Sequence, residues 1–324
     1  MNDALSRPSP GRFAAGTPEV SMLATRLVTG TLLVAALVAV LVLDEQFAPW
    51  YPFWLLTAIA VMGLSALEIN ALLGETSAKP SGTTVFGGVL ALVVANWAPH
   101  VVEHLQQPLR LVEPAYEPLA PISWLAWPLW AFVAIVMLAF IAQSAQFYSP
   151  GGTMATISGT VLATAYIGVL GSFLVQMRWL GAGSTGIVPL AALIATAKGA
   201  DTGAYTMGRL AGRHKLWPRL SPSKTIEGAL GGMLAGVLAA LVVFGVARLL
   251  FHVPSLSWVA AIGYGVVVGS AAQLGDLMES MIKRDCGWKD ASTAVPGFGG
   301  VLDVMDSLLF AGPVAYGYWL LMQS

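Results

Sequence analysis

The chain has 324 residues, of which 56% are hydrophobic and 10% are charged, and its mean hydropathy is +0.74. A soluble domain carries about 25% charged residues, so this composition excludes a soluble globular protein and predicts an integral membrane protein. The net charge of −1 carries little information. The single cysteine, Cys286, excludes a disulfide framework and a cysteine-based metal site.

Residues 1–20 are polar and rich in Pro, Gly and Ser. A segment of this composition buries too little apolar surface to fold. We therefore expect residues 1–20 to form a disordered arm, which the charge distribution described below places in the cytoplasm.

Long apolar segments fill most of the remaining chain. A helix needs about 20 apolar residues to cross a bilayer. The candidate spans are Leu23–Leu43, Phe53–Leu73, Val85–Val102, Trp124–Gln143, Met154–Met177, Ile187–Tyr205, Ile226–Phe251, Trp258–Gln273 and Val301–Met322. The sequence thus predicts an all-α, polytopic integral membrane protein with about nine transmembrane helices. We divide it into N-terminal transmembrane helices over residues 21–180 and a C-terminal transmembrane region over residues 181–324.

Lys and Arg are distributed unevenly between the two sides that these spans define. Only Arg110, Arg178 and Arg248 fall on the side opposite to the N-terminus, whereas the loops 207–225 and 281–300 are the richest in cations. Cytoplasmic loops retain Lys and Arg. We therefore expect a multi-pass protein of the cell's inner (cytoplasmic) membrane, with both basic loops facing the cytoplasm.

Ionisable side chains inside the spans indicate where a functional site lies. Such groups are costly in a membrane and usually face a partner or a wet cavity. They are Glu68, Lys198, Asp201, Glu227, Asp276, Glu279, Asp303 and Asp306. All but Glu68 follow residue 197, so we assign the catalytic site to residues 181–324.

Two groups of acids have helical spacing. Asp276 and Glu279 share one stripe with Lys283, and Asp303 and Asp306 repeat the i, i+3 spacing. Asp303 alone could be a helix cap. Two acids on one face can instead hold Mg²⁺, which takes one or two carboxylates and completes its shell with substrate phosphates. We predict that Asp276, Asp303 and Asp306 bind Mg²⁺.

Cations accompany these acids in both loops. Lys283, Arg284 and Lys289 lie between the two acidic pairs and suit phosphate oxygens. The other basic loop contains Lys224 and is flanked by Asp201 and Glu227. A basic loop can simply be attracted to acidic lipid, but such a loop has no use for the flanking acids. The pattern favours a site for phosphate and metal.

At these residues the chain resembles the phosphatidate cytidylyltransferase family, also called CDP-diacylglycerol synthase. The family's C-terminal signature runs Ser, two residues, Lys-Arg, four residues, Lys-Asp, then a Pro-x-His-Gly-Gly turn and Asp-Arg-x-Asp. Its upstream stretch runs Asp-Thr-Gly-Ala-Tyr and continues to Ser-Pro-x-Lys-Thr-x-Glu-Gly. The matching positions here are Asp201–Tyr205, Ser221–Gly228, Ser280, Lys283, Arg284, Lys289, Asp290, Ser292, Pro296, Gly299, Gly300, Asp303 and Asp306. The signature's histidine is Phe298 here, and the arginine between its aspartates is Val304.

The resemblance implies that CTP and phosphatidate react to give CDP-diacylglycerol and pyrophosphate, with Mg²⁺ as cofactor. It implies catalytic roles for Asp276, Lys283, Lys289, Asp290, Asp303 and Asp306, and substrate-binding roles for Asp201, Lys224, Glu227, Glu279 and Arg284. A membrane lipid is the expected partner, a homodimer is implied by the family, and no nucleic acid is expected.

Three alternatives remain open at this point. The first is a CTP-dependent transferase or kinase that acts on an isoprenoid lipid, because both kinds of lipid tail are hydrocarbon. The second is an ion-coupled transporter, in which intramembrane acids are common. The third is a non-catalytic relative, suggested by Phe298 and Val304.

Overall fold

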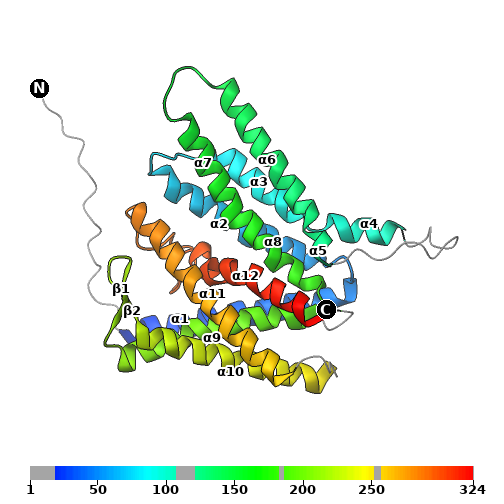
Figure 1. The fold of residues 1–324 in the computed structure, drawn as a ribbon, viewed down its shortest axis with the longest axis vertical. Helices are drawn as coiled ribbons and strands as arrows, with labels where there is room; N and C mark the ends of the chain where they lie inside the picture. Colours follow the sequence, from blue (N-terminus) through cyan, green and yellow to red (C-terminus); the bar gives the residue numbers. More distant parts are fainter. Residues whose placement is uncertain (1–18, 107–120, 182–185, 252–256, 324) are drawn as a thin grey trace, which may run out of the picture.

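The computed structural model describes residues 19–106, 121–181, 186–251 and 257–323. The predicted arm, residues 1–20, therefore lies outside the described residues except for its last two, which begin the first helix. Within the described ranges the chain is nearly all helix, and its one sheet is a two-stranded antiparallel hairpin. The all-α architecture is thus confirmed (Figure 1).

The helices run through the whole described chain. In chain order they are α1 (Glu19–Asp44), η1 (Glu45–Phe47), α2 (Pro52–Gly74), α3 (Gly82–Ala95), α4 (Ala98–Gln106), α5 (Pro121–Trp124), α6 (Ala126–Ala145), α7 (Thr153–Thr164), η3 (Ala165–Val169), α8 (Leu170–Gln176), η4 (Met177–Trp179), α9 (Ile187–Ala211), α10 (Ile226–Phe251), α11 (Trp258–Asp285) and α12 (Val301–Gln323). The strands β1 (Lys215–Trp217) and β2 (Ser221–Thr225) form the hairpin between α9 and α10.

Eight helical segments of the described chain are long and apolar enough to cross a membrane, against about nine expected. The segment that differs is α9, which has 25 residues but carries Lys198, Asp201 and Arg209. α9 is therefore long enough to cross a membrane, but its charged residues lower its hydropathy below that of the other spans. Its polarity, rather than its length, accounts for the difference from the prediction.

The outer surface of the helices is apolar. Leu234, Leu238 and Val242 of α10 are each more than half exposed, and α1 is almost wholly exposed along its apolar window. In water such a surface would be unstable, whereas hydrocarbon solvates it at no cost. The exposed leucines and valines are the lipid-facing side of a membrane protein.

The site-bearing helices pack closely through small residues. A Cβ on Gly203 of α9 would stand 2.6 Å from the carbonyl oxygen of Gly231 in α10, so glycine allows the two backbones to touch. α11 packs on both α10 and α12, and α12 also contacts α2 and α8. α12 thereby joins the C-terminal helices to the N-terminal ones.

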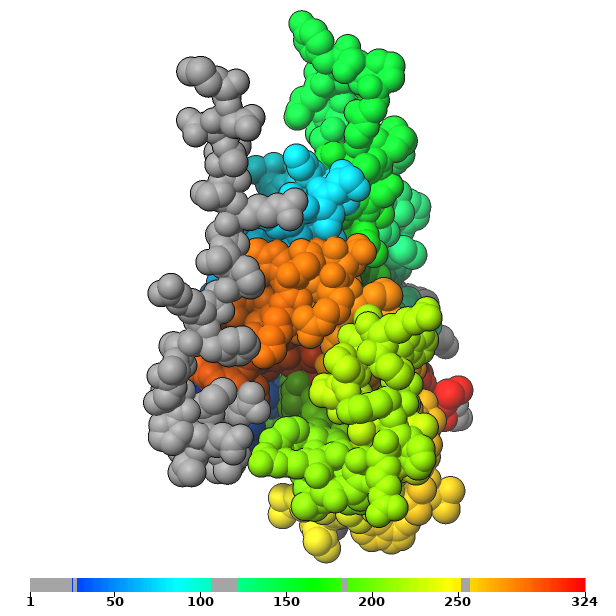
Figure 2. Space-filling model, turned by 90° about the vertical axis from the view of Figure 1, so that its left-hand side faces the viewer, coloured from blue at the N-terminus to red at the C-terminus, as the bar shows by residue number. Residues whose placement is uncertain are grey.

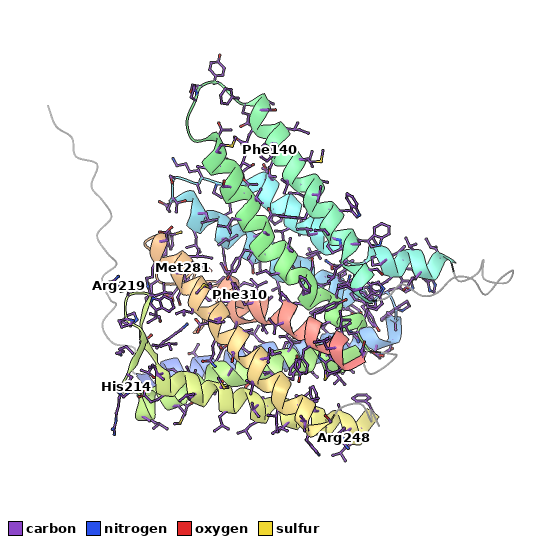
Figure 3. All side chains as sticks on the ribbon, in the orientation of Figure 1. Phe140, His214, Arg219, Arg248, Met281 and Phe310 are labelled. Atoms are coloured by element: carbon purple, nitrogen blue, oxygen red, sulfur yellow. The ribbon has the colours of Figure 1, made fainter. Side chains whose placement is uncertain are left out.

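The hairpin and the C-terminal end of α11 lie at the same end of the molecule, and the chain's C-terminus lies toward the opposite end (Figure 1). The side chains of His214 and Arg219 mark the hairpin, and Arg248 marks the far end of α10 (Figure 3). Viewed from the hairpin end, the orange tip of α11 and its following loop lie between the hairpin and the cyan α2–α3 region (Figure 2). The two basic loops of the sequence, 207–225 and 281–300, therefore lie at the same end of the molecule.

Candidate active site

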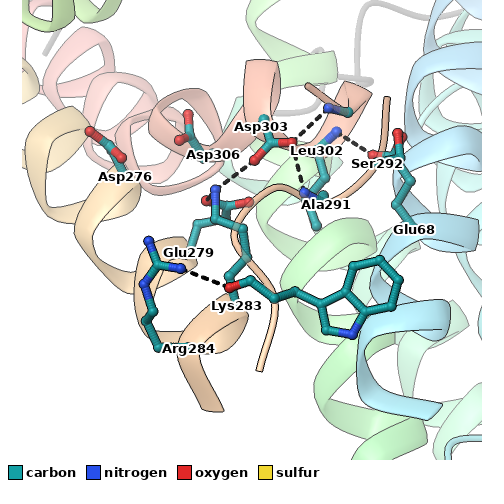
Figure 4. A network of polar contacts seen from close by, with 12 residues as sticks. Glu68, Asp276, Glu279, Lys283, Arg284, Ala291, Ser292, Leu302, Asp303 and Asp306 are labelled. Atoms are coloured by element: carbon teal, nitrogen blue, oxygen red, sulfur yellow. Dashed lines mark hydrogen bonds and ion pairs between the residues drawn. The ribbon is translucent and has the colours of Figure 1, made fainter. Parts of the chain in front are cut away.

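A buried lysine forms the centre of the first part of the site. Lys283 of α11 makes ion pairs with Glu279, one turn earlier on the same helix, and with Asp303 of α12 at 2.5 Å (Figure 4). The three side chains are 11%, 0% and 7% exposed, respectively. Two carboxylates therefore share one ammonium away from bulk water, where each would be unstable without it.

Asp303 also fixes the loop that precedes its own helix. Its Oδ2 accepts hydrogen bonds from the backbone N–H groups of Ala291 at 2.9 Å and Gly300 at 2.6 Å. Its Oδ1 is held by Lys283. Both oxygens are thus engaged, and the capping contact to Gly300 satisfies an N–H that the helix cannot.

A carboxylate from the N-terminal region closes this loop. Glu68 of α2 accepts hydrogen bonds from the Ser292 hydroxyl at 2.6 Å and from the N–H groups of Val301 at 3.1 Å and Leu302 at 2.7 Å. Because a Cβ on Gly300 would stand 2.6 Å from Glu68 Oε2, glycine is required for this approach. The adjacent Gly299 has φ of 105°, which only glycine adopts readily.

The second part of the site lies between α9 and α12. Lys198 Nζ donates to Asp201 Oδ2 at 3.2 Å, to the Val304 carbonyl at 2.8 Å and to Ser307 Oγ at 2.9 Å. Ser307 Oγ in turn donates to Asp201 Oδ2 at 3.0 Å. These contacts tie the polar face of α9 to the first turns of α12.

Asp306 connects the two parts. Its buried carboxylate interacts electrostatically with Lys198, Asp276 and Asp201, and it lies beside Asp276 in Figure 4. Asp276 itself pairs with Lys224 of the hairpin at 3.0 Å. Three carboxylates and two lysines from α9, β2, α11 and α12 therefore converge on one region.

Two hollows adjoin this region. The first, of about 340 Å³, is lined by Asp201, Lys224 and Asp276 together with small and polar residues of α9, α10 and the hairpin. The second is an open, mainly apolar groove of about 910 Å³ between α9 and α10, which Lys198 and Glu227 also line. A polar pocket thus lies on one side of α9 and an apolar groove on the other.

The structure brings together seven of the predicted site residues and places the other four at the margins of this region. The seven are Asp201, Lys224, Asp276, Glu279, Lys283, Asp303 and Asp306. Glu227 binds the hairpin base instead, accepting from Arg213 N at 3.0 Å and from His214 Nδ1 at 2.6 Å. Arg284, Lys289 and Asp290 are exposed around the end of α11, and Arg284 donates to the Trp288 carbonyl at 2.9 Å.

Three residues outside the predicted set also belong to this region. Lys198 and Glu68 were visible in the sequence as ionisable groups within spans, but their partners lie on distant segments. Tyr166 gave no such signal. Its buried hydroxyl has no hydrogen-bond partner in the described part of the chain and interacts electrostatically with Glu279, Asp306 and Asp276. It projects from η3, a π-helical turn, and such turns are frequent at functional sites.

The oxygen atoms of the site suit a hard divalent cation. Within the described residues no group of three His, Cys, Asp or Glu side chains is arranged to hold a metal by itself. Mg²⁺ needs only one or two carboxylates when phosphates complete its shell. Asp276 and Asp306 fit that requirement, since among the described residues Asp276 pairs with Lys224 alone and Asp306 makes no salt bridge.

The two apolar replacements in the signature have different surroundings. Phe298 is 42% exposed, and its ring faces α1, since a Cβ on Gly30 would stand 3.5 Å from it. Val304 lies against α9, where its carbonyl accepts from Lys198. Phe298 thus contacts an apolar helix, whereas Val304 borders the polar cluster.

A cluster of acids and lysines that is surrounded by apolar spans is typical of a membrane-embedded site for a charged ligand. The chain belongs to the Cytidylyltransferase family, whose model matches residues 24–322.

The chain is similar to several proteins named phosphatidate cytidylyltransferase. The protein from Staphylococcus epidermidis is 46% identical over 114 residues, which cover 35% of this chain and 42% of that protein. The protein from Staphylococcus haemolyticus is 44% identical over 115 residues, with 35% and 42% covered. The protein from Staphylococcus aureus is 42% identical over 114 residues, again with 35% and 42% covered. The similarity therefore spans less than half the length of these relatives.

Proposed function

We propose that this protein is a phosphatidate cytidylyltransferase that converts CTP and phosphatidate to CDP-diacylglycerol and pyrophosphate. The observation that carries the proposal is the convergence of Asp201, Lys224, Asp276 and Asp306 beside a polar pocket, with an apolar groove on the other side of α9. The family match and the name of the relatives support it.

The two hollows suit the two substrates. The polar pocket, with Lys224 on its wall, is the proposed place of the CTP phosphates, because ammonium groups neutralise phosphate oxygens. The groove between α9 and α10, lined by Leu230, Leu234 and Leu238, is the proposed place of the acyl chains. An isoprenoid chain would fit the same groove, so the test below distinguishes the lipids.

The chemistry needs positioning more than proton transfer. An oxygen of the lipid phosphate attacks the α-phosphorus of CTP, the bond from that phosphorus to the bridging oxygen breaks, and pyrophosphate leaves. The nucleophile is already an anion, so no strong general base is required. Lys224 and Lys283 are proposed to neutralise the phosphates, and Arg284 and Lys289 to attract them from the aqueous side.

Mg²⁺ is the proposed cofactor, which would supply charge neutralisation at the phosphates. We assign its binding to Asp276 and Asp306. We assign Asp303 to holding Lys283 and the following loop, because both its oxygens are engaged there. Glu279 would keep Lys283 in place, and Glu227 would keep the hairpin in place. Asp290, on the loop that approaches Gly299, is proposed to assist from the exposed side. We further propose that the site faces the cytoplasm at the inner membrane and that the protein is a homodimer.

The test uses purified protein in detergent micelles with Mg²⁺, CTP labelled at either the α- or the γ-phosphate, and either phosphatidate or polyprenyl phosphate as the lipid. Label from the α-phosphate in CDP-diacylglycerol is the expected result, and chelation of Mg²⁺ should abolish it. Label from the γ-phosphate would show a kinase. Product formed only with polyprenyl phosphate would show an isoprenoid enzyme. Transport of a solute into vesicles, without any labelled lipid, would overturn the proposal in favour of a transporter.

A further inference from the structure

All three N–H donors of Lys198 are engaged within the protein, unlike those of a lysine that binds substrate. An ammonium group has three N–H donors, and Lys198 directs them to Asp201, the Val304 carbonyl and Ser307. No donor is left for a phosphate. The geometry therefore suits a residue that positions other groups.

The acceptors of Lys198 on α12 share one stripe. Val304 and Ser307 stand at i and i+3, and residues so spaced are neighbours on a helix surface. Lys198 contacts the backbone carbonyl of Val304 and the side-chain hydroxyl of Ser307, so the first turns of α12 face α9 here. A long basic side chain at position 304 would extend along the same stripe. The resembling signature carries an arginine at this position, and this chain carries Val304.

We propose that Lys198 supplies from α9 the positive charge that the signature's arginine carries on α12. This inference rests on the proposed function. Lys198 fixes Asp201 through Oδ2 and lies within electrostatic range of Asp306. Without Lys198, the described part of this region would contain three carboxylates, those of Asp201, Asp276 and Asp306, and Lys224 as the one remaining cation among them.

The test moves the charge from one helix to the other. The variants are Lys198→Met, Lys198→Arg, Val304→Arg and the double variant Lys198→Met/Val304→Arg. Lys79→Met is the matched control, because Lys79 is an exposed lysine in the α2–α3 turn. Lys198→Gln replaces Lys198→Met in all comparisons if the methionine variant does not fold, as judged by gel filtration and thermal melting.

The first measurement is the rate of CDP-diacylglycerol formation. Lys198→Met should lower kcat about tenfold or more while KM for CTP changes less than about threefold, since positioning acts on the transition state. Lys198→Arg and the double variant should stay within about threefold of the wild-type kcat, because a cation is again present. A double variant as slow as Lys198→Met, or Lys198→Met as fast as Lys79→Met, would overturn the proposal.

The second measurement does not depend on activity. Mg²⁺ is titrated without nucleotide, and the shift in melting temperature gives the midpoint of binding. Removing a cation beside three carboxylates strengthens their attraction for Mg²⁺, so the midpoint of Lys198→Met should fall at least about threefold and return in the double variant. Equal midpoints in all variants would contradict the proposal. If wild-type protein makes no CDP-lipid, the proposed function fails, and these midpoints still decide the role of Lys198.

Discussion

Ser292 donates its hydroxyl to Glu68 over 2.6 Å, although 224 residues separate the two in the chain. Glu68 belongs to α2, and Ser292 to the loop between α11 and α12. The same carboxylate accepts the first N–H groups of α12. The N-terminal helices therefore help to build the site.

Glu68→Leu should lower both stability and activity. The N–H groups of Val301 and Leu302 would lose their acceptor in a buried place, at a cost of about 1–3 kcal/mol for each unsatisfied group. Glu68→Gln keeps one acceptor oxygen and should lose less. Melting temperature in detergent and kcat give the readout, with the exposed Glu75→Leu as control. Equal melting of the Glu68→Leu and Glu75→Leu variants would disprove the role of Glu68.

Gly300→Ala should disturb the same contact between Glu68 and the start of α12, this time from the side of α12. Its methyl group would stand 2.6 Å from Glu68 Oε2, and the resulting displacement should cost about 1–3 kcal/mol. Adding Glu68→Asp, with its shorter side chain, should recover part of the loss. Gly317→Ala on α12 is the matched control, because a Cβ there meets nothing within 4 Å. Thermal melting that shows no difference between Gly300→Ala and Gly317→Ala would refute the prediction.

Asp306→Asn should nearly abolish product formation. The substitution keeps size and removes the charge proposed to bind Mg²⁺, and several kcal/mol of charge stabilisation correspond to a loss of at least about a hundredfold in kcat. The control is Asp285→Asn, an exposed aspartate at the end of α11. The measurement is the α-label assay at saturating Mg²⁺, with melting to confirm folding. A folded Asp306→Asn protein with wild-type kcat would exclude Asp306 from the metal site.

Substitutions in the ion pair of Arg178 and Glu45, at the end of the molecule opposite to the site, should lower stability without lowering activity. Arg178 is 0% exposed, pairs with Glu45 at 2.6 Å and lies over the Tyr51 ring at 3.9 Å. Glu45→Gln should destabilise the protein by about 3 kcal/mol, the low end for a broken buried pair, because Glu45 is 27% exposed.

A double-mutant cycle provides the check on this pair. Arg178→Met/Glu45→Gln should be less destabilised than the sum of the two single variants, since it leaves no unpaired charge. The kcat of the folded fraction should not change, because Arg178 lies far from the site. It adjoins Leu180, whose carbonyl accepts a hydrogen bond from Gln323 near the end of α12 opposite to the site. Additive losses, or a reduced kcat in folded protein, would contradict this separation.

Local features of the site could be predicted from the sequence. The stripe of Asp276, Glu279 and Lys283 lies on α11 as expected, because helical spacing alone determines which residues share a face. Thr225 directly precedes α10 and caps it, since its Oγ1 accepts a hydrogen bond from Gly228 N at 3.0 Å. The membrane architecture followed from apolar length, apart from the polar α9.

Pairings between distant segments could not be predicted in the same way. Nothing in the spacing of Lys198 points to Val304, and nothing near Glu68 points to Leu302, because helix packing decides both contacts. The hairpin of β1 and β2 was read only as a basic loop, since its strands are short and polar. The assignment of Glu227 to the nucleotide stays a prediction, as does the division of the chain at residue 180.

Glu68 also constrains how the protein is made. A chain leaves the ribosome N-terminus first, so α2 enters the membrane long before the residues that Glu68 binds have been synthesised. Its partners Val301 and Leu302 lie 233 and 234 residues later. Until then the Glu68 carboxylate lacks the N–H partners that hold it in the folded protein. The site can therefore form only after α12 has been synthesised, because a chain stalled before α12 would also lack Asp303 and Asp306.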